Sequence, residues 1–231
     1  SLMNFISMWL VRIGLAFVLT PKFGLIGYWI AMCAELNVRG ILFLWRLRGE
    51  KWMKDCWIPG GTETFWDCSN IEVEDSVIER ADYVFMHCEN IKLRNVKLQG
   101  NYGFQYAKNV EIHNCVLNSK DSFWEAENVT VYDSVINGEY LAWYSKNVRL
   151  VRCHITETQP LCYCEDLLLE DCTFGSDSDL AFEYSSVQAT VKGHVVSIKN
   201  PRSGRIHVES VGEIIIDGNI KAPGNCEITT G

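Results

Sequence analysis

Apolar and polar residues alternate along the middle of the chain in short runs that recur at a nearly constant spacing. The run Asn109-Val110-Glu111-Ile112 is typical, because its aliphatic side chains fall at every second position, as in a strand rather than a helix. Each run begins at an Asn or Asp, and these anchors recur at a steady interval: Asn70, Asn90, Asn109, Asn128, Asn147 and Asp166. A fixed period of about 20 residues predicts a solenoid.

A second polar column follows the anchors, at Asp75, Asn95, Asn114, Asp133, Arg152 and Asp171. Asn and Asp tolerate left-handed backbone and bind nearby amides, so both columns predict corners. A further run such as Cys115-Val116-Leu117 comes after each corner. We therefore expect three short strands and three corners per unit, in an all-β right-handed parallel β-helix with about 19 to 20 residues per coil. An antiparallel sandwich would not need this constant register.

The N-terminal part has a different pattern, with two apolar spans at residues 2–19 and 23–45, separated by Thr20-Pro21-Lys22. Their lengths predict a transmembrane α-helical hairpin. Basic residues gather behind the second span, at Arg46, Arg48, Lys51 and Lys54. The positive-inside rule then places that end, and everything after it, on the cytoplasmic side of a bacterial inner membrane. We expect two domains, residues 1–54 and residues 55–231, with the membrane as a partner of residues 1–46.

Charge is divided unevenly between these two parts. Residues 1–54 hold seven Lys or Arg and two acids, whereas residues 55–231 hold 14 and 27, within a net charge of −8 for the chain. The acidic second part offers no basic surface suited to nucleic acid. Cysteines occupy small positions beside the anchors and corners, which is typical of buried thiols in a reducing cytosol. Cys162-Tyr163-Cys164 lacks metal-binding spacing, so we expect neither a metal nor a cofactor.

The N-terminal part, residues 1–54, resembles the end of a known transporter family. Residues 24–32, then Glu35, Arg39, Phe43 and Arg46, then residues 49–52, resemble the last transmembrane helix and tail of multidrug and toxic compound extrusion (MATE) transporters, and residues 9–16 are similar to the preceding helix. The resemblance implies a cation-coupled drug antiporter. Because only its final two helices are present, we expect transport only if the remaining helices precede Ser1 in a longer protein.

Three ionisable residues fall inside the apolar spans. Glu35 and Arg39 are spaced to lie on one face of a helix, and Arg12 belongs to the neighbouring span. Ionisable groups at membrane depth suggest function by default. With the transport core missing, the favoured interpretation is a structural ion pair.

The repeated part has a resemblance of its own. Residues 119–124, 127–134, 180–185 and 197–204 resemble an uncharacterised bacterial family of right-handed β-helix proteins. This resemblance covers residues 55–231 and implies a pectin-lyase-like fold. It implies no activity, since a fold does not define the chemistry it carries.

Candidate ligand-binding residues follow the repeat. An outward column of aromatic residues beside carboxylates could bind a sugar chain, and basic residues near Gly204 could hold an anion; the candidates are Trp66, Trp124, Trp143, Glu125, Tyr144, Glu183, Lys199 and Arg202. Glu125, Asp121 and Glu183 are candidates for a general acid or base. The alternative for all of these residues is a packed ladder with solvated carboxylates.

These observations leave three hypotheses of function. The first is a non-enzymatic, membrane-tethered β-helix that binds or scaffolds a ligand, the second is a polysaccharide-acting enzyme, and the third is an antiporter with further helices upstream. The first solenoid coil also lacks a recognisable cap, because its anchor would fall at Glu50. An uncapped coil predicts end-to-end self-association.

Overall fold

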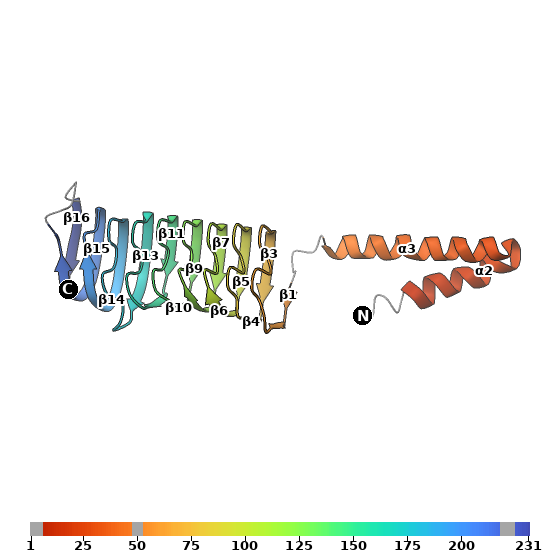
Figure 1. The fold of residues 1–231 in the computed structure, drawn as a ribbon, viewed down its shortest axis with the longest axis horizontal. Coiled ribbons are helices and arrows are strands. Elements are labelled where there is room, and N and C mark those ends of the chain that lie inside the picture. Colours follow the sequence, from red (N-terminus) through yellow and green to blue (C-terminus); the bar gives the residue numbers. More distant parts are fainter. Residues whose placement is uncertain (1–6, 48–52, 218–224) are drawn as a thin grey trace. The chain divides into compact units, whose positions relative to one another are not determined.

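The computed structural model describes residues 7–47, 53–217 and 225–231. The chain divides into two compact units, Ser1–Trp52 and Met53–Gly231. The first unit contains a short π-helix η1 (Ser7–Ile13), followed by α2 (Gly14–Phe23) and α3 (Leu25–Leu47). Gly24, with a φ of 56°, ends α2, and its amide donates to the carbonyl of Thr20. Figure 1 shows α2 turning back along α3.

The predicted transmembrane hairpin is wrong. Among the described helices, none is both long and apolar enough to cross a membrane. The first span is divided between η1 and α2, and the ten residues of α2 reach only about 15 Å, half the thickness of a bilayer core. Helix α3 has 23 residues, but Glu35 and Arg39 lie within it. The expected location in the inner membrane was inferred from these spans, and the same finding overturns it.

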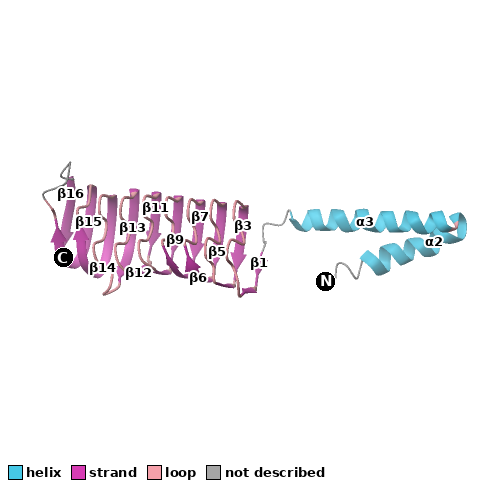
Figure 2. Ribbon diagram, in the orientation of Figure 1, coloured by secondary structure: helices cyan, strands magenta, loops and turns pink. Residues whose placement is uncertain are grey.

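The second unit is an all-parallel β-solenoid of about nine turns, as the solenoid prediction required. Strands on one side are β1 (Met53–Lys54), β3 (Ser69–Glu74), β5 (Glu89–Arg94), β7 (Lys108–His113), β9 (Glu127–Tyr132) and β11 (Lys146–Val151). Strands on the next side are β2 (Trp57–Ile58), β4 (Val77–Glu79), β6 (Lys97–Asn101), β8 (Val116–Lys120), β10 (Val135–Asn137) and β12 (His154–Thr156). Figure 2 shows the strands stacked in parallel rows.

Longer strands complete the unit. Strand β13 (Glu165–Phe174) pairs with both β11 and β12 and so joins the two sides. It is followed by β14 (Ser186–Lys199), β15 (Ser203–Ile215) and β16 (Asn225–Thr230), each paired in parallel with the strand before it. The repeat therefore becomes less regular toward its end.

Both polar columns form corners, as their residue types predict. The six anchors have φ values of 52° to 58°, and the six residues of the second column have values of 50° to 54°. Side chains of the anchors also form a ladder from coil to coil: Asn90 Nδ2 donates to Asn70 Oδ1 at 3.0 Å, and Asn109 Nδ2 to Asn90 Oδ1 at 3.0 Å. Each Asn anchor thus supports both the left-handed turn and the contact between coils.

The third side of the coil differs from the expected strand, because it forms turns. Two residues of one coil there, Tyr83 and His87, have left-handed φ values of 54° and 56°, which a pleated strand does not allow. Their amides still bond to the next coil, since Tyr83 N donates to Asn101 O at 2.9 Å. We call these segments the turn side. Some of these left-handed residues, such as Tyr83, are only partly buried, whereas Phe123 lies in the core.

The core lies between the three sides. Phe65, Phe85, Phe104 and Phe123 form one stack, with ring centroids 5.3, 5.1 and 4.7 Å apart. Small buried residues, including Cys88 and Cys115, fill the corners beside it. Burial raises the pKa of both thiols to about 11. Cys68 occupies the same column as Cys88 but is exposed, because it lies in the first coils of the unit.

Candidate functional site

A continuous group of aromatic rings covers part of the turn side. We call it the aromatic face, formed by Trp124, Tyr140, Trp143, Tyr144, Tyr163 and Tyr184. Tyr144 stacks on Tyr163 with centroids 4.8 Å apart and planes at 13°, and Tyr163 stacks on Tyr184 at 5.6 Å. Trp143 meets Tyr163 edge to face at 5.2 Å. The repeat produces this surface by placing ring over ring in successive coils.

The polar atoms of these rings are partly occupied within the chain. Trp143 Nε1 donates to the carbonyl of Gln159 at 2.8 Å, and Trp124 Nε1 donates to Glu125 Oε1 at 3.2 Å. Burial, followed by the nearby Glu183 and Tyr144, raises the pKa of Tyr163 to about 12. The indoles are therefore held in fixed orientations, which favours a ligand that stacks on their faces.

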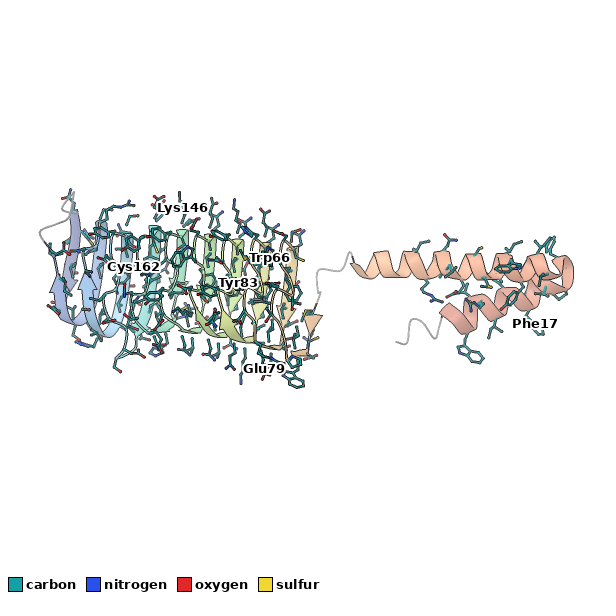
Figure 3. The ribbon with its side chains drawn as sticks, in the orientation of Figure 1. Phe17, Trp66, Glu79, Tyr83, Lys146 and Cys162 are labelled. Atoms are coloured by element: carbon teal, nitrogen blue, oxygen red, sulfur yellow. The ribbon has the colours of Figure 1, made fainter. Side chains whose placement is uncertain are left out.

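A shallow depression at one edge of the aromatic face adds charged groups. It is lined by Glu125, Tyr144, Lys146, Tyr163 and Glu165. Lys146 Nζ lies 3.3 Å from Glu165 Oε2, and 45% of the Tyr144 surface is exposed. Figure 3 shows Lys146 at one edge of the unit and Glu79 at the opposite edge, with Tyr83 between them. The depression therefore combines a ring face with a carboxylate and an ammonium group.

The structure brings only some of the candidate residues together. Trp124, Trp143, Glu125 and Tyr144 belong to the aromatic face or its depression. Trp66 is 41% exposed but lies in the first coils. Met86 and Gln105 occupy the positions between Trp66 and Trp124 in the same column, so Trp66 is separated from the aromatic face.

The remaining candidates lie in later coils. Glu183 is buried and pairs with Lys199, whose Nζ is 2.9 Å from Glu183 Oε1. This hydrogen bond is the main reason why the pKa of Lys199 is raised. Arg202 is exposed, and its amide donates to the carbonyl of Ser185. Lys199 is thus already paired with the Glu183 carboxylate. Glu125 lies in another coil, at the edge of the aromatic face, so Glu183 and Glu125 have different surroundings.

Sequence reasoning missed a wide groove on the other edge of the turn side, which we call the polar groove. Its lining is mostly amides, glycines and charged residues: Trp57, Pro59, Thr62, Glu79, Arg80, Asp82, Gln99, Gly100, Asn101, Asn118, Ser119, Lys120, Asn137, Gly138, Glu139 and Glu157. Tyr83, Tyr102 and Tyr140 recur in step with the repeat, and this recurrence was the signal that could have drawn attention to this edge.

The three ionisable residues of the first unit meet, as a structural ion pair requires. The Glu35 side chain is fully buried, and its Oε2 accepts from Arg12 Nη2 at 3.3 Å. Its Oε1 accepts from Arg39 Nε at 2.8 Å and also from Arg39 Nη2. Arg12 therefore links η1 to α3. The basic residues Arg46, Arg48 and Lys51 lie outside the described side chains.

Among the described residues, no group of His, Cys, Asp and Glu side chains is arranged to hold a metal ion. Burial raises the pKa of Cys162 to about 12 and that of Cys164 to about 11, so both thiols are protonated at neutral pH. A thiolate is the form that binds metals, and these two cysteines are therefore poor ligands.

Fold and site together define a parallel β-solenoid protein with aromatic and polar surfaces on its turn side. A family model described as "Protein of unknown function (DUF3737)" matches residues 35–229, so the chain belongs to this family. No curated protein and no solved structure matches the chain significantly. The family match begins inside α3 and includes residues 35–54, the stretch that resembles a transporter tail. A resemblance to MATE transporters is not shown.

Proposed function

We propose that the solenoid is a non-enzymatic binding module and that the aromatic face takes a carbohydrate chain. The main support for this proposal is the unbroken series of ring contacts from Trp124 to Tyr184, with partly exposed rings and fixed indole orientations. Sugar rings present apolar C–H faces that pack on aromatic side chains, while their hydroxyls need polar partners. Glu125 and Lys146, at the edge of the face, supply an acceptor and a donor.

Binding is favoured over hydrolysis by the surroundings of the carboxylates. Glycoside hydrolysis needs two carboxyl groups across one bond, about 5 to 10 Å apart. Glu125 accepts from Trp124 at the edge of the aromatic face, whereas Glu183 is buried against Lys199. A buried, ion-paired Glu183 is poorly suited to act with Glu125 on a single sugar bond.

The test is a titration of the full chain with soluble oligosaccharides, among them cellohexaose, xylohexaose and oligogalacturonate, followed by tryptophan fluorescence and calorimetry. We expect at least one to bind, and Tyr144→Ala to weaken it about tenfold, since loss of one stacking contact removes roughly 1 to 1.5 kcal/mol.

The matched control is Trp57→Ala, because Trp57 is an exposed ring away from the aromatic face, with 67% of its surface accessible. The control should bind like the parent chain. If Tyr144→Ala binds the same oligosaccharide as tightly as the parent, the aromatic face is not the sugar site.

A further inference from the structure

A second ring column on the turn side is interrupted at one position. Tyr83, Tyr102, Asp121 and Tyr140 are equivalent residues of consecutive coils, as the backbone bonds show. Tyr102 N donates to Lys120 O at 2.8 Å. One coil later, Asp121 N makes the equivalent bond to Glu139 O at 2.9 Å. The rings of Tyr83 and Tyr102 stack at 4.8 Å with planes at 5°. Asp121 therefore stands where a ring would continue this stack.

Asp121 has an unusual environment for a carboxylate. Only 4% of the residue is exposed, and its backbone is left-handed, with a φ of 51°. Among the residues that the structure describes, none donates a hydrogen bond to its carboxylate. Burial raises its pKa, an effect that Lys120 opposes and Glu139 increases. The Asp121 oxygens are not among the fully buried, unpartnered side-chain atoms of the described residues, so they reach the surface, where a cation can pair with them.

Lys120 shows that this place accepts a cation. Its Nζ lies 5.1 Å from the centroid of the Tyr140 ring and 3.0 Å from Glu139 Oε2. The Lys120 side chain is 42% exposed, so its pairing with Glu139 is screened by water. Exposed pairs of this kind stabilise a fold little, and Lys120 can swing into solvent at small cost. A ligand would then meet the face of Tyr140.

The spacing of the coils fixes what fits between the flanking rings. Two coils advance about 9.6 Å, twice the strand spacing, so a flat group that replaced Lys120 between Tyr102 and Tyr140 would lie at stacking distance from both rings. Lys120 and Glu139 also line the polar groove, which gives a route to this position. Nearby carboxylates make the surroundings negative, since Asp82 and Asp121 contribute to the raised pKa of Tyr83 after burial and Tyr102.

We propose that Asp121 and the rings of Tyr102 and Tyr140 form a slot for a planar cation, a guanidinium or amidinium group. Such groups stack on aromatic faces and donate two parallel hydrogen bonds to one carboxylate. The cation is carried either by a small molecule or by an arginine side chain of a peptide. The slot differs from the carbohydrate site in ligand class and shares only the Tyr140 ring with the aromatic face, and neither proposal requires the other.

The experiment titrates the full chain with benzamidine by calorimetry and ligand-detected NMR. We expect saturable binding to the parent chain and binding about tenfold weaker, or undetectable, for Asp121→Asn, which removes the charge and keeps the shape. Asp121→Tyr should abolish binding, because its ring fills the slot. This variant should also unfold at the parent's temperature or higher, since it completes the stack.

Glu127→Gln is the matched control, because Glu127 is a carboxylate of the same coil that lies on β9 and pairs with Lys108. It should bind benzamidine like the parent. If Asp121→Tyr fails to fold, the test relies on Tyr140→Leu and Asp121→Asn, and both variants should bind benzamidine more weakly than the parent chain. The proposal is overturned if the parent does not bind benzamidine at millimolar concentration, or if Asp121→Asn binds equally well.

The source of the cation is tested separately with agmatine and with the peptides Gly-Arg-Gly and Gly-Lys-Gly. Tighter binding of Gly-Arg-Gly than of agmatine assigns the slot to arginine side chains, and the reverse order assigns it to small molecules. Equal binding of the arginine and lysine peptides would contradict the requirement for a planar cation. Oligosaccharide binding should be unchanged in Asp121→Asn, so the two proposals fail independently.

Discussion

At the scale of single residues, position within the coil decides which side chains the fold accepts. Ala126 and Cys115 point into the core and are almost fully buried, whereas Gln99 lies exposed on the outer face of β6. A side chain that is tolerated on the outer face is destabilising on the inner face, because successive side chains of a strand point to opposite faces.

Replacing Ala126 with Arg should destabilise the solenoid by about 3 to 5 kcal/mol, since it buries an unpaired charge in a packed core. Chemical unfolding followed by circular dichroism measures the change. Gln99→Arg is the control, because Gln99 pairs in register with Glu79 and remains solvated. Equal stabilities for the parent and Ala126→Arg would show that the inward column is wrongly assigned.

Asp121→Asn should stabilise the chain at neutral pH and lose this advantage as the pH falls. Burial raises the pKa of Asp121 above its ordinary value of 3.8, so the native state binds the proton more tightly than the unfolded state. The charged form therefore destabilises the fold at any pH above the native pKa, and the cost disappears as the pH falls through the native pKa toward 3.8. Urea unfolding of both chains at several pH values measures the difference. A constant difference across this range would contradict the argument.

At the scale of structural elements, the anchor ladder joins neighbouring coils at the start of each strand. Asn109 takes part twice, because its Nδ2 donates to Asn90 and its Oδ1 accepts from Asn128 at 3.1 Å. Its backbone is also left-handed, with a φ of 56°. The residue therefore combines a conformational preference with two hydrogen bonds.

Asn109→Ala should cost about 2 to 3 kcal/mol, the sum of two exposed hydrogen bonds and the strain of a left-handed alanine. Asn109→Gly removes the same hydrogen bonds but adopts this backbone freely, so it should cost less than the alanine variant. Denaturant midpoints of the three chains give the comparison. Equal losses for Ala and Gly would mean that backbone strain does not contribute.

A charge ladder on the same side of the solenoid was not predicted from the sequence. Glu89, Lys108, Glu127, Lys146 and Glu165 are in register on successive strands, so opposite charges alternate from coil to coil. Lys108 Nζ lies 3.7 Å from Glu127 Oε2, and Lys146 Nζ lies 3.3 Å from Glu165 Oε2. Alternation avoids the repulsion that identical charges would cause at the strand spacing.

At the scale of the whole molecule, the first coil has strand edges that pair on one side only among the described residues. Strand β1 pairs with β3, and β2 pairs with β4. Trp57 on β2 is strongly exposed, and Met53 and Ile58 are only partly buried against the end of the core. Such edges are templates for further strands.

We expect a truncated chain beginning at Asp55 to form end-to-end dimers or larger assemblies whose size grows with concentration, because each free edge can pair with another copy. Sedimentation over a wide concentration range is the measurement. Trp57→Lys should weaken the association by setting like charges against each other, while Gln99→Lys, on an outer face, should leave it unchanged. A monomer at every concentration would show that residues 55–64 cap the coil.

Repetition is what the sequence by itself determined. The steady interval between anchors, the left-handed Asn and Asp columns and the inward small and aliphatic residues all follow from contacts between neighbouring coils. Such contacts recur at a fixed separation along the chain and can therefore be read from it. Four of the ligand candidates, Trp124, Trp143, Glu125 and Tyr144, were brought together for the same reason.

Tertiary structure alone decided the features that depend on geometry beyond this repeat. Apolar length suggested a membrane hairpin, but the change from π-helix η1 to α2 and the buried Glu35 with its two arginines belong to helices that do not meet the requirements of a span. The stacking of coils decides which rings of the turn side meet at the surface, and so creates the aromatic face beside the polar groove. The sequence made Asp121 a candidate general acid or base, and only the structure shows that it is buried between two tyrosine positions.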